Sequence, residues 1–88
     1  MTSEPALSDP PTWTRVGQAL VRTDTAPTFP AAIGWVVAVA QVAEAMNHHP
    51  DIDVRYRQVT WRLTTHSTGA ITELDVDLAH QIDRIVNP

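Results

Sequence analysis

Cysteine is absent from this 88-residue chain, which excludes both a disulfide framework and a metal site built on thiolates. The absence of disulfides fits a reducing compartment. Lysine is absent too, and six arginines stand against ten acidic residues, giving a net charge of −4. Without a basic block, nucleic acid is not expected as a partner. Three glycines are too few to suggest a glycine-rich phosphate loop.

Long apolar runs are also missing from the start of the chain, where residues 1–10 include Glu4, Asp9 and two prolines. This composition predicts no signal peptide, and no apolar stretch is expected to reach the roughly 18 residues that a membrane span requires. We therefore expect a soluble, cytoplasmic protein without membrane contact. A chain of 88 residues predicts one domain with a small core, which association with further copies would enlarge.

The first half of the chain divides into a tail, a hairpin and a helix. Residues 1–12 contain three prolines and predict a flexible N-terminal tail, whereas residues 13–88 predict a single folded domain. Residues 13–24 are interpreted as a short hairpin that turns at Gly17-Gln18. A helix is predicted over residues 29–46, because its apolar residues recur at helical spacing and Thr28 can cap it.

This predicted helix is unusual because it has no charged residue between Thr28 and Ala43. A helix that is apolar nearly all round needs a partner on two sides. The sheet supplies one partner, and a second subunit is expected to supply the other, since large apolar patches are uncommon on monomers. A covering loop or the N-terminal arm is the alternative.

Residues 51–65 alternate between apolar and polar side chains, but the phase of the alternation changes once. Two strands joined by a loop at Arg57-Gln58 remove this conflict. The predicted register pairs Asp53 with Arg62. Continued outward, the same register places His49 opposite His66. The predicted pairs on the apolar side are Tyr56 with Val59, Val54 with Trp61, and Ile52 with Leu63.

The last helix is predicted to begin with the capping box Thr72-Glu73-Leu74-Asp75, after a break at Gly69-Ala70. Its apolar residues recur at helical spacing as far as Ile85. The order hairpin, helix, hairpin, helix predicts an α+β fold in which helices pack on one face of an antiparallel sheet.

Three histidines are predicted to converge where the first helix meets the outer ends of the second hairpin. Histidine has an unperturbed pKa of about 6.5, so His48, His49 and His66 can act together as acid and base on one substrate. Glu44 lies one helical turn before His48 and is placed to orient that ring, while Asp75 is placed to approach His66. The residues alone leave another interpretation open, in which the histidines are ordinary polar residues, Asp75 only caps its helix and Glu44 only adds charge.

Two other chemistries have weaker support. Histidines and a carboxylate can hold zinc, but the chain has no His-Glu-x-x-His spacing. Nucleophilic catalysis lacks a cysteine, and no serine stands in a nucleophile-elbow setting.

The combined spacing resembles the pterin-4a-carbinolamine dehydratase family. The resemblance rests on Glu44-x-x-x-His48-His49-Pro50, the aromatic Tyr56, Thr65-His66, Gly69, and Asp75 followed by Leu78-Ala79. It extends from about Phe29 to Ile85 and more faintly back to Trp13. The chain departs from the family pattern at its start, because the three prolines before Trp13 suggest that the N-terminal helix of the family is short or missing. Residues 23–28 lack the phenylalanines usual there, and Gly69-Ala70 replaces a pair of glycines.

The resemblance implies a four-stranded antiparallel sheet with helices on one face, and a homodimer or homotetramer. It also implies a lyase that needs no metal or cofactor and converts 4a-hydroxytetrahydropterin to quinonoid dihydropterin and water, which recycles the pterin of aromatic amino acid hydroxylation. His48 and His66 would be the acid–base partners, and His49 would bind or position the pterin. Glu44 and Asp75 would have supporting roles. The alternative is a non-catalytic binding or scaffold protein on the same fold.

Overall fold

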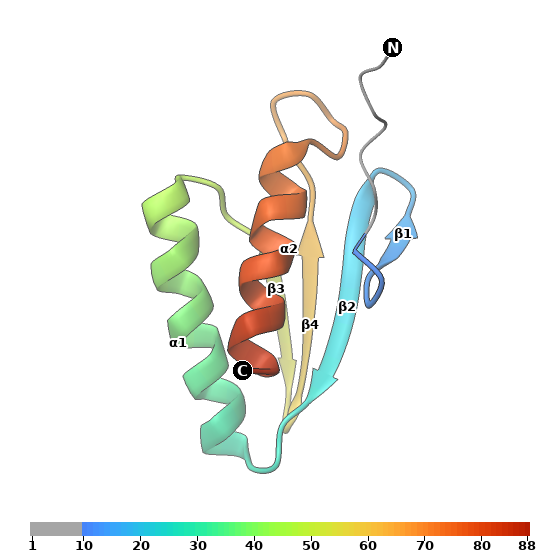
Figure 1. The fold of residues 1–88 in the computed structure, drawn as a ribbon. Helices are drawn as coiled ribbons and strands as arrows, with labels where there is room; N and C mark the ends of the chain where they lie inside the picture. The colour runs from blue at the N-terminus through green and yellow to red at the C-terminus, as the bar shows by residue number, and fades with distance from the viewer. Residues whose placement is uncertain (1–9) are drawn as a thin grey trace.

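A computed structural model describes residues 10–88, which form one four-stranded antiparallel sheet and two helices (Figure 1). The sheet has the strand order β1-β2-β4-β3, and both helices cover the same face of it. The predicted α+β class is therefore confirmed. The elements are β1 (Thr14–Val16), β2 (Ala19–Thr25), α1 (Phe29–Met46), β3 (Asp51–Arg55), β4 (Gln58–Leu63) and α2 (Glu73–Val86).

The first hairpin forms as predicted, with β1 and β2 paired and the chain turning at Gly17. Gly17 adopts a left-handed backbone with φ of 59°, which costs glycine little because it has no Cβ. Before β1, the amide of Trp13 donates to the carbonyl of Pro10 at 3.0 Å, so residues 10–13 form a turn. Residues 1–9 of the tail predicted over residues 1–12, and with them the expected short or missing N-terminal helix, lie outside the described residues.

Helix α1 has the bounds that the sequence predicts. The Thr28 hydroxyl accepts a hydrogen bond from the amide of Ala31 at 3.1 Å, which satisfies one of the free donors of the first turn. Ala32, Val39 and Ala43 are buried against the core. The outer side of the helix carries an exposed apolar stripe, which we define as Phe29, Ile33, Val37 and Ala40.

By length and composition, α1 is the one helix within residues 10–88 that is apolar enough to cross a membrane. The expectation that no apolar stretch reaches this length is therefore wrong. This finding is weak support for a membrane span, because a core helix of a protein that stays in water passes the same test. In this fold α1 packs against α2 and the core.

The second hairpin forms, but its predicted register is wrong by two residues. The turn lies at Tyr56-Arg57, so Val54 faces Val59 and Asp51, not Asp53, faces Arg62. The prediction counted Tyr56 among the apolar residues of the sheet. Instead Tyr56 has a left-handed backbone with φ of 55°, is 72% exposed and stacks on Phe29 with ring centroids 6.4 Å apart. A shift of two residues keeps every side chain on its predicted face of the sheet.

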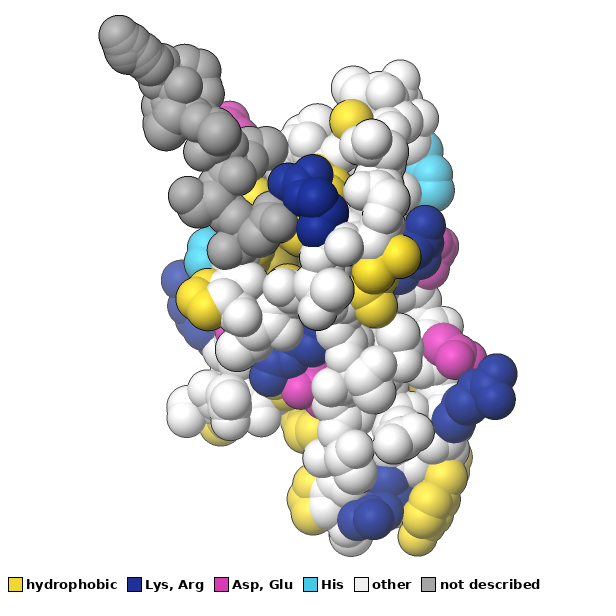
Figure 2. Space-filling model, turned by 90° about the vertical axis from the view of Figure 1, so that its right-hand side faces the viewer, with side chains coloured by type: hydrophobic (Ala, Val, Ile, Leu, Met, Phe, Trp, Pro, Cys, Tyr) yellow, Lys and Arg dark blue, Asp and Glu magenta, His cyan; other side chains and the backbone are white. Residues whose placement is uncertain are grey.

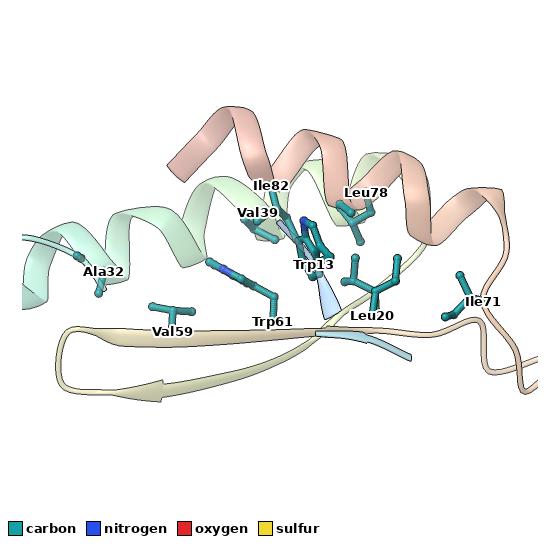
Figure 3. Packing of buried hydrophobic residues seen from close by; sticks show 12 residues of the cluster. Trp13, Leu20, Ala32, Val39, Val59, Trp61, Ile71, Leu78 and Ile82 are labelled. Carbon is teal, nitrogen blue, oxygen red and sulfur yellow. The ribbon is translucent and has the colours of Figure 1, made fainter. Parts of the chain in front are cut away.

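Seen from the side of the β1 edge, the molecule has scattered arginines with acidic side chains among them (Figure 2). Between the sheet and the helices, large side chains of both layers meet (Figure 3). Trp61, Leu20, Leu63, Leu78 and Ile82 are fully buried there. Capping of α2 is also as predicted, because Thr72 and Asp75 form a capping box.

A polar cluster crosses the core at the end of the domain away from the histidines. The Arg22 guanidinium, only 10% exposed, bridges Asp24 on its own strand and Asp83 on α2, with N–O distances of 2.8 and 2.6 Å. The indole N–H groups of Trp13 and Trp61 donate to Asp83 and Asp24 respectively. Because the buried donors have acceptors, this cluster fastens α2 to the sheet without leaving an unpaired charge.

Candidate active site

The candidate site begins at the end of α1, where Asn47 turns the chain out of the helix. Asn47 has a left-handed backbone with φ of 52° and ψ of 43°. The amide of His48 donates to the carbonyl of Ala43 at 3.0 Å, and the amide of Asn47 donates to the carbonyl of Glu44 at 3.1 Å. This pair of bonds is the Schellman ending of a helix. It sends the two adjacent histidines in different directions, so His48 is buried and His49 is exposed.

This ending gives a testable prediction about Asn47. An Asn47→Val variant should lower the free energy of unfolding by about 1–2 kcal/mol, because a β-branched residue tolerates the left-handed region poorly. An Asn47→Gly variant should be at least as stable as the natural chain. Urea denaturation monitored by tryptophan fluorescence measures both. Equal stabilities of the two variants would show that Asn47 does not need this backbone conformation.

His48 points inward and pairs with a buried carboxylate. Its Nε2 lies 2.6 Å from Oδ1 of Asp75, which is completely buried, and His48 itself is only 9% exposed. The other oxygen of Asp75, Oδ2, accepts hydrogen bonds from the amide of Thr72 at 2.9 Å and from the hydroxyl of Thr65 at 2.7 Å. Asp75 therefore caps α2 and holds a histidine at the same time.

His49 points outward and pairs with Glu44, with 2.9 Å between Nε2 and Oε1. Both side chains are largely exposed, at 58% and 80%. Water screens such a pair, so it contributes little to stability. The ring of His49 can therefore move toward a ligand with little loss of stability.

The two predicted carboxylate partners are wrong. Glu44 was expected to orient His48 but contacts His49, and Asp75 was expected to approach His66 but contacts His48. The first prediction assumed that helical spacing continues to His48, whereas Asn47 ends the helix before it. Once His48 turns inward, it meets the buried carboxylate of Asp75.

His66 follows β4 in the loop that leads to α2. Its side chain is exposed, and within residues 10–88 its ring has no hydrogen-bond partner. The loop is anchored at Thr65, whose amide donates to the carbonyl of Ala70 at 3.1 Å and whose carbonyl accepts from the amide of Gly69 at 2.9 Å. The observed hairpin register does not put His49 opposite His66, so this loop rather than strand pairing brings His66 to the site.

One pocket of about 390 Å³ brings the three histidines together. It is lined by Asn47, His48, His49, Pro50, Asp51, Thr65, His66, Ser67 and Leu74. A larger hollow of about 740 Å³ adjoins it across Leu74 and is lined by residues of the same loop and of the first turn of α2. The pocket is therefore lined by a buried imidazole paired with Asp75, an exposed imidazole paired with Glu44, and a third that has no hydrogen-bond partner among residues 10–88. Within residues 10–88, no group of three or more His, Asp or Glu side chains is arranged to hold a metal ion.

Two residues of this site had no assigned role in the sequence interpretation. Asn47 could have been found, because Asn directly after an apolar helical run is a known helix-ending signal. Thr65 was noted only as the neighbour of His66. Its hydroxyl contact with Asp75 depends on how α2 docks beside the end of β4, which no local pattern encodes.

By its fold and its pocket, this chain is a small α+β protein with three clustered imidazoles, and imidazoles can transfer protons near neutral pH. The sequence model of the family described as pterin 4 alpha carbinolamine dehydratase matches residues 2–85. The chain belongs to this family.

Two similar proteins carry the provisional name pterin-4-alpha-carbinolamine dehydratase. The one from Nocardia farcinica is 55% identical over 80 residues, covering 91% of this chain and 84% of that protein. The one from Roseiflexus sp. (strain RS-1) is 53% identical over 83 residues, covering 94% of this chain and 89% of that protein.

Two solved structures share the fold. One, from Brucella melitensis and described as a transcriptional coactivator/pterin dehydratase, superposes with a TM-score of 0.84 at 32% identity, covering 88% of this chain and 84% of that one. The other is described as a pterin dehydratase-like protein that is a RuBisCO assembly factor in the alpha-carboxysome. It has a TM-score of 0.75 at 18% identity, covers 86% of this chain and 90% of that one, and shows the likeness of fold alone.

Proposed function

We propose that this protein is a hydro-lyase that dehydrates 4a-hydroxytetrahydropterin to quinonoid dihydropterin and water, recycling pterin for aromatic amino acid hydroxylation. The observation that carries the proposal is the pocket in which His48, His49 and His66 meet, in a chain that belongs to the dehydratase family. The reaction has no net oxidation or reduction, so it needs no redox cofactor, and the proposal assigns both proton transfers to histidines without a metal.

The proposed mechanism divides the two proton transfers between two histidines. The bond between C4a and the hydroxyl oxygen breaks when that oxygen receives a proton and leaves as water. The adjacent ring nitrogen loses its proton, and its electron pair forms the new double bond to C4a. In this proposal the carboxylate of Asp75 accepts from Nε2–H of His48, which leaves Nδ1 of His48 as the base. His66, whose ring has no hydrogen-bond partner among residues 10–88, supplies the acid, while His49 binds and positions the pterin and Glu44 supports His49.

A stopped-flow assay of carbinolamine dehydration tests the proposal. The natural chain is expected to accelerate the reaction well above the rate measured with a His48→Ala/His66→Ala double variant. Equal rates for the two would refute the enzyme proposal. They would favour a non-catalytic binding protein on the same fold, a role consistent with the assembly function given for the 18% identical relative.

We further propose that the protein is a cytoplasmic homodimer or homotetramer, and that the exposed apolar stripe of α1 packs against a second copy. The stripe includes Val37, which is 53% exposed, and water is a poor solvent for so many apolar side chains. The arginines in Figure 2 are dispersed among acidic side chains, which supports the absence of nucleic acid from the proposed partners.

The assembly is tested by light scattering after size-exclusion chromatography. A Val37→Glu variant is expected to have a smaller molecular mass than the natural chain, because it places a charge in the proposed contact. His80→Glu, on the exposed side of α2, is the matched control and should leave the mass unchanged. A natural chain that is monomeric, or that floats with lipid vesicles, would contradict this proposal.

A further inference from the structure

We propose that Thr65 is a positioning residue that acts through Asp75 to hold the imidazole of His48 in one tautomer and one orientation. The inference deepens the proposed dehydratase function and rests on it for its catalytic consequence. Thr65 does not contact His48 by hydrogen bonding. Its hydroxyl lies 2.7 Å from Oδ2 of Asp75, while His48 is bound to Oδ1 of the same carboxylate.

The hydrogen bonds around Thr65 can have only one direction. A hydroxyl has a single proton, and that of Thr65 is donated to Asp75. The 2.7 Å contact between the hydroxyls of Thr65 and Thr72 must then use the proton of Thr72. The Thr72 oxygen in turn accepts from the amide of Leu74 at 3.3 Å. Donation thus runs from the first turn of α2 through two hydroxyls to Asp75.

This chain of donors orients the carboxyl group of Asp75. Its Oδ2 accepts from the Thr65 hydroxyl and the Thr72 amide, so Oδ1 is the oxygen that is left for His48. In the proposed arrangement Oδ1 accepts from Nε2–H of His48, as a carboxylate that acts only as an acceptor requires. Such charge-assisted bonds are short and directional, as the 2.6 Å separation shows. Without the Thr65 hydroxyl, a fully buried carboxylate would lose one of its three donors, and the ring bound to it would be less firmly held.

The hydroxyl of Thr65 can be tested apart from its backbone, which anchors the loop of His66. Thr65→Val removes the hydroxyl at nearly constant volume, whereas Thr65→Ser keeps it. Thr64→Val is a matched control one residue earlier, because the hydroxyl of Thr64 bonds to the carbonyl of Gln18 instead. Thermal unfolding establishes that each variant is folded, and Thr65→Ala replaces Thr65→Val if the latter does not fold.

Two readouts separate positioning from a general structural role. Long-range ¹H–¹⁵N spectra of the histidine rings should show the single Nε2–H tautomer of His48 in the natural chain, Thr65→Ser and Thr64→Val. They should show a mixture of tautomers in Thr65→Val. In the dehydration assay, Thr65→Val should lower kcat about 10- to 100-fold with little change in KM, as expected for the loss of one hydrogen bond to a charged group.

An unchanged tautomer and kcat in a folded Thr65→Val variant would overturn the inference, as would an equal loss in Thr64→Val. The spectra need no substrate, so the two proposals fail separately. A natural chain without dehydratase activity refutes the proposed function, while the tautomer of His48 in Thr65→Val still decides whether Thr65 positions that ring.

Discussion

Replacing His48 with alanine should lower kcat for carbinolamine dehydration by about 10²- to 10⁴-fold, the usual contribution of a positioned acid–base group. His48 has the properties that such a group needs. It is almost fully buried, it lines the pocket, and its Nε2 is fixed by a carboxylate at 2.6 Å, so the ring is held in place for the proposed proton transfer at little entropic cost. Stopped-flow kinetics at saturating substrate measure the change.

Two further variants serve as controls: His48→Gln tests whether the loss of activity comes from a less stable fold, and His49→Ala tests the role of the neighbouring histidine. His48→Gln retains an N–H that can reach Asp75, so its stability should approach that of the natural chain while its kcat remains low. His49→Ala should mainly raise KM, about tenfold, because this exposed ring is proposed to contribute one binding contact. A larger loss of kcat in His49→Ala than in His48→Ala would reverse the proposed roles.

Replacing Asp75 with alanine should damage both activity and stability. The free energy of unfolding should fall by about 2–4 kcal/mol, because the variant removes a helix cap and leaves the donors of Thr65, Thr72 and His48 without their acceptor. The kcat should fall with it, since nothing then holds the ring of His48. Urea denaturation gives the first quantity and the dehydration assay the second.

Asp75→Asn separates the two effects. The amide oxygen can still cap the amide of Thr72, so the loss of stability should be smaller than in the alanine variant. The amide lacks the charge that orders Nε2–H of His48, so kcat should remain low. If Asp75→Asn were fully active, the carboxylate would be a helix cap alone.

Local patterns were enough to predict the elements of this fold. Thr28 marked the start of α1, Gly17-Gln18 marked the turn of the first hairpin, and alternation of apolar residues marked the second hairpin. Caps, turns and side-chain periodicity act over only a few residues. The register of the second hairpin could not be predicted in the same way. Tyr56 fits an apolar sheet position by type, whereas in the structure it has a left-handed backbone in the turn and its ring stacks on Phe29, a contact with another element that no local pattern encodes.

The candidate site could also be predicted only in part from local patterns. The sequence was sufficient to single out His48, His49 and His66, and the structure brings them to one pocket. Their carboxylate partners were assigned from sequence distance, which fails when one residue changes the direction of the chain. Asn47 makes that change, and the position of Asp75 depends on the docking of α2.

Because Asp75 both caps α2 and holds His48, the proposed chemistry depends on how often the first turn of α2 opens. The amide of Thr72 is protected from hydrogen exchange only while Asp75 accepts from it, and the same side chain must be in place for His48 to be held. Helix ends open far more often than whole domains unfold. Exchange at this one amide therefore reports the free energy with which the site opens. On warming, the site should be lost with the first turn of α2, before the core anchored at Arg22 unfolds.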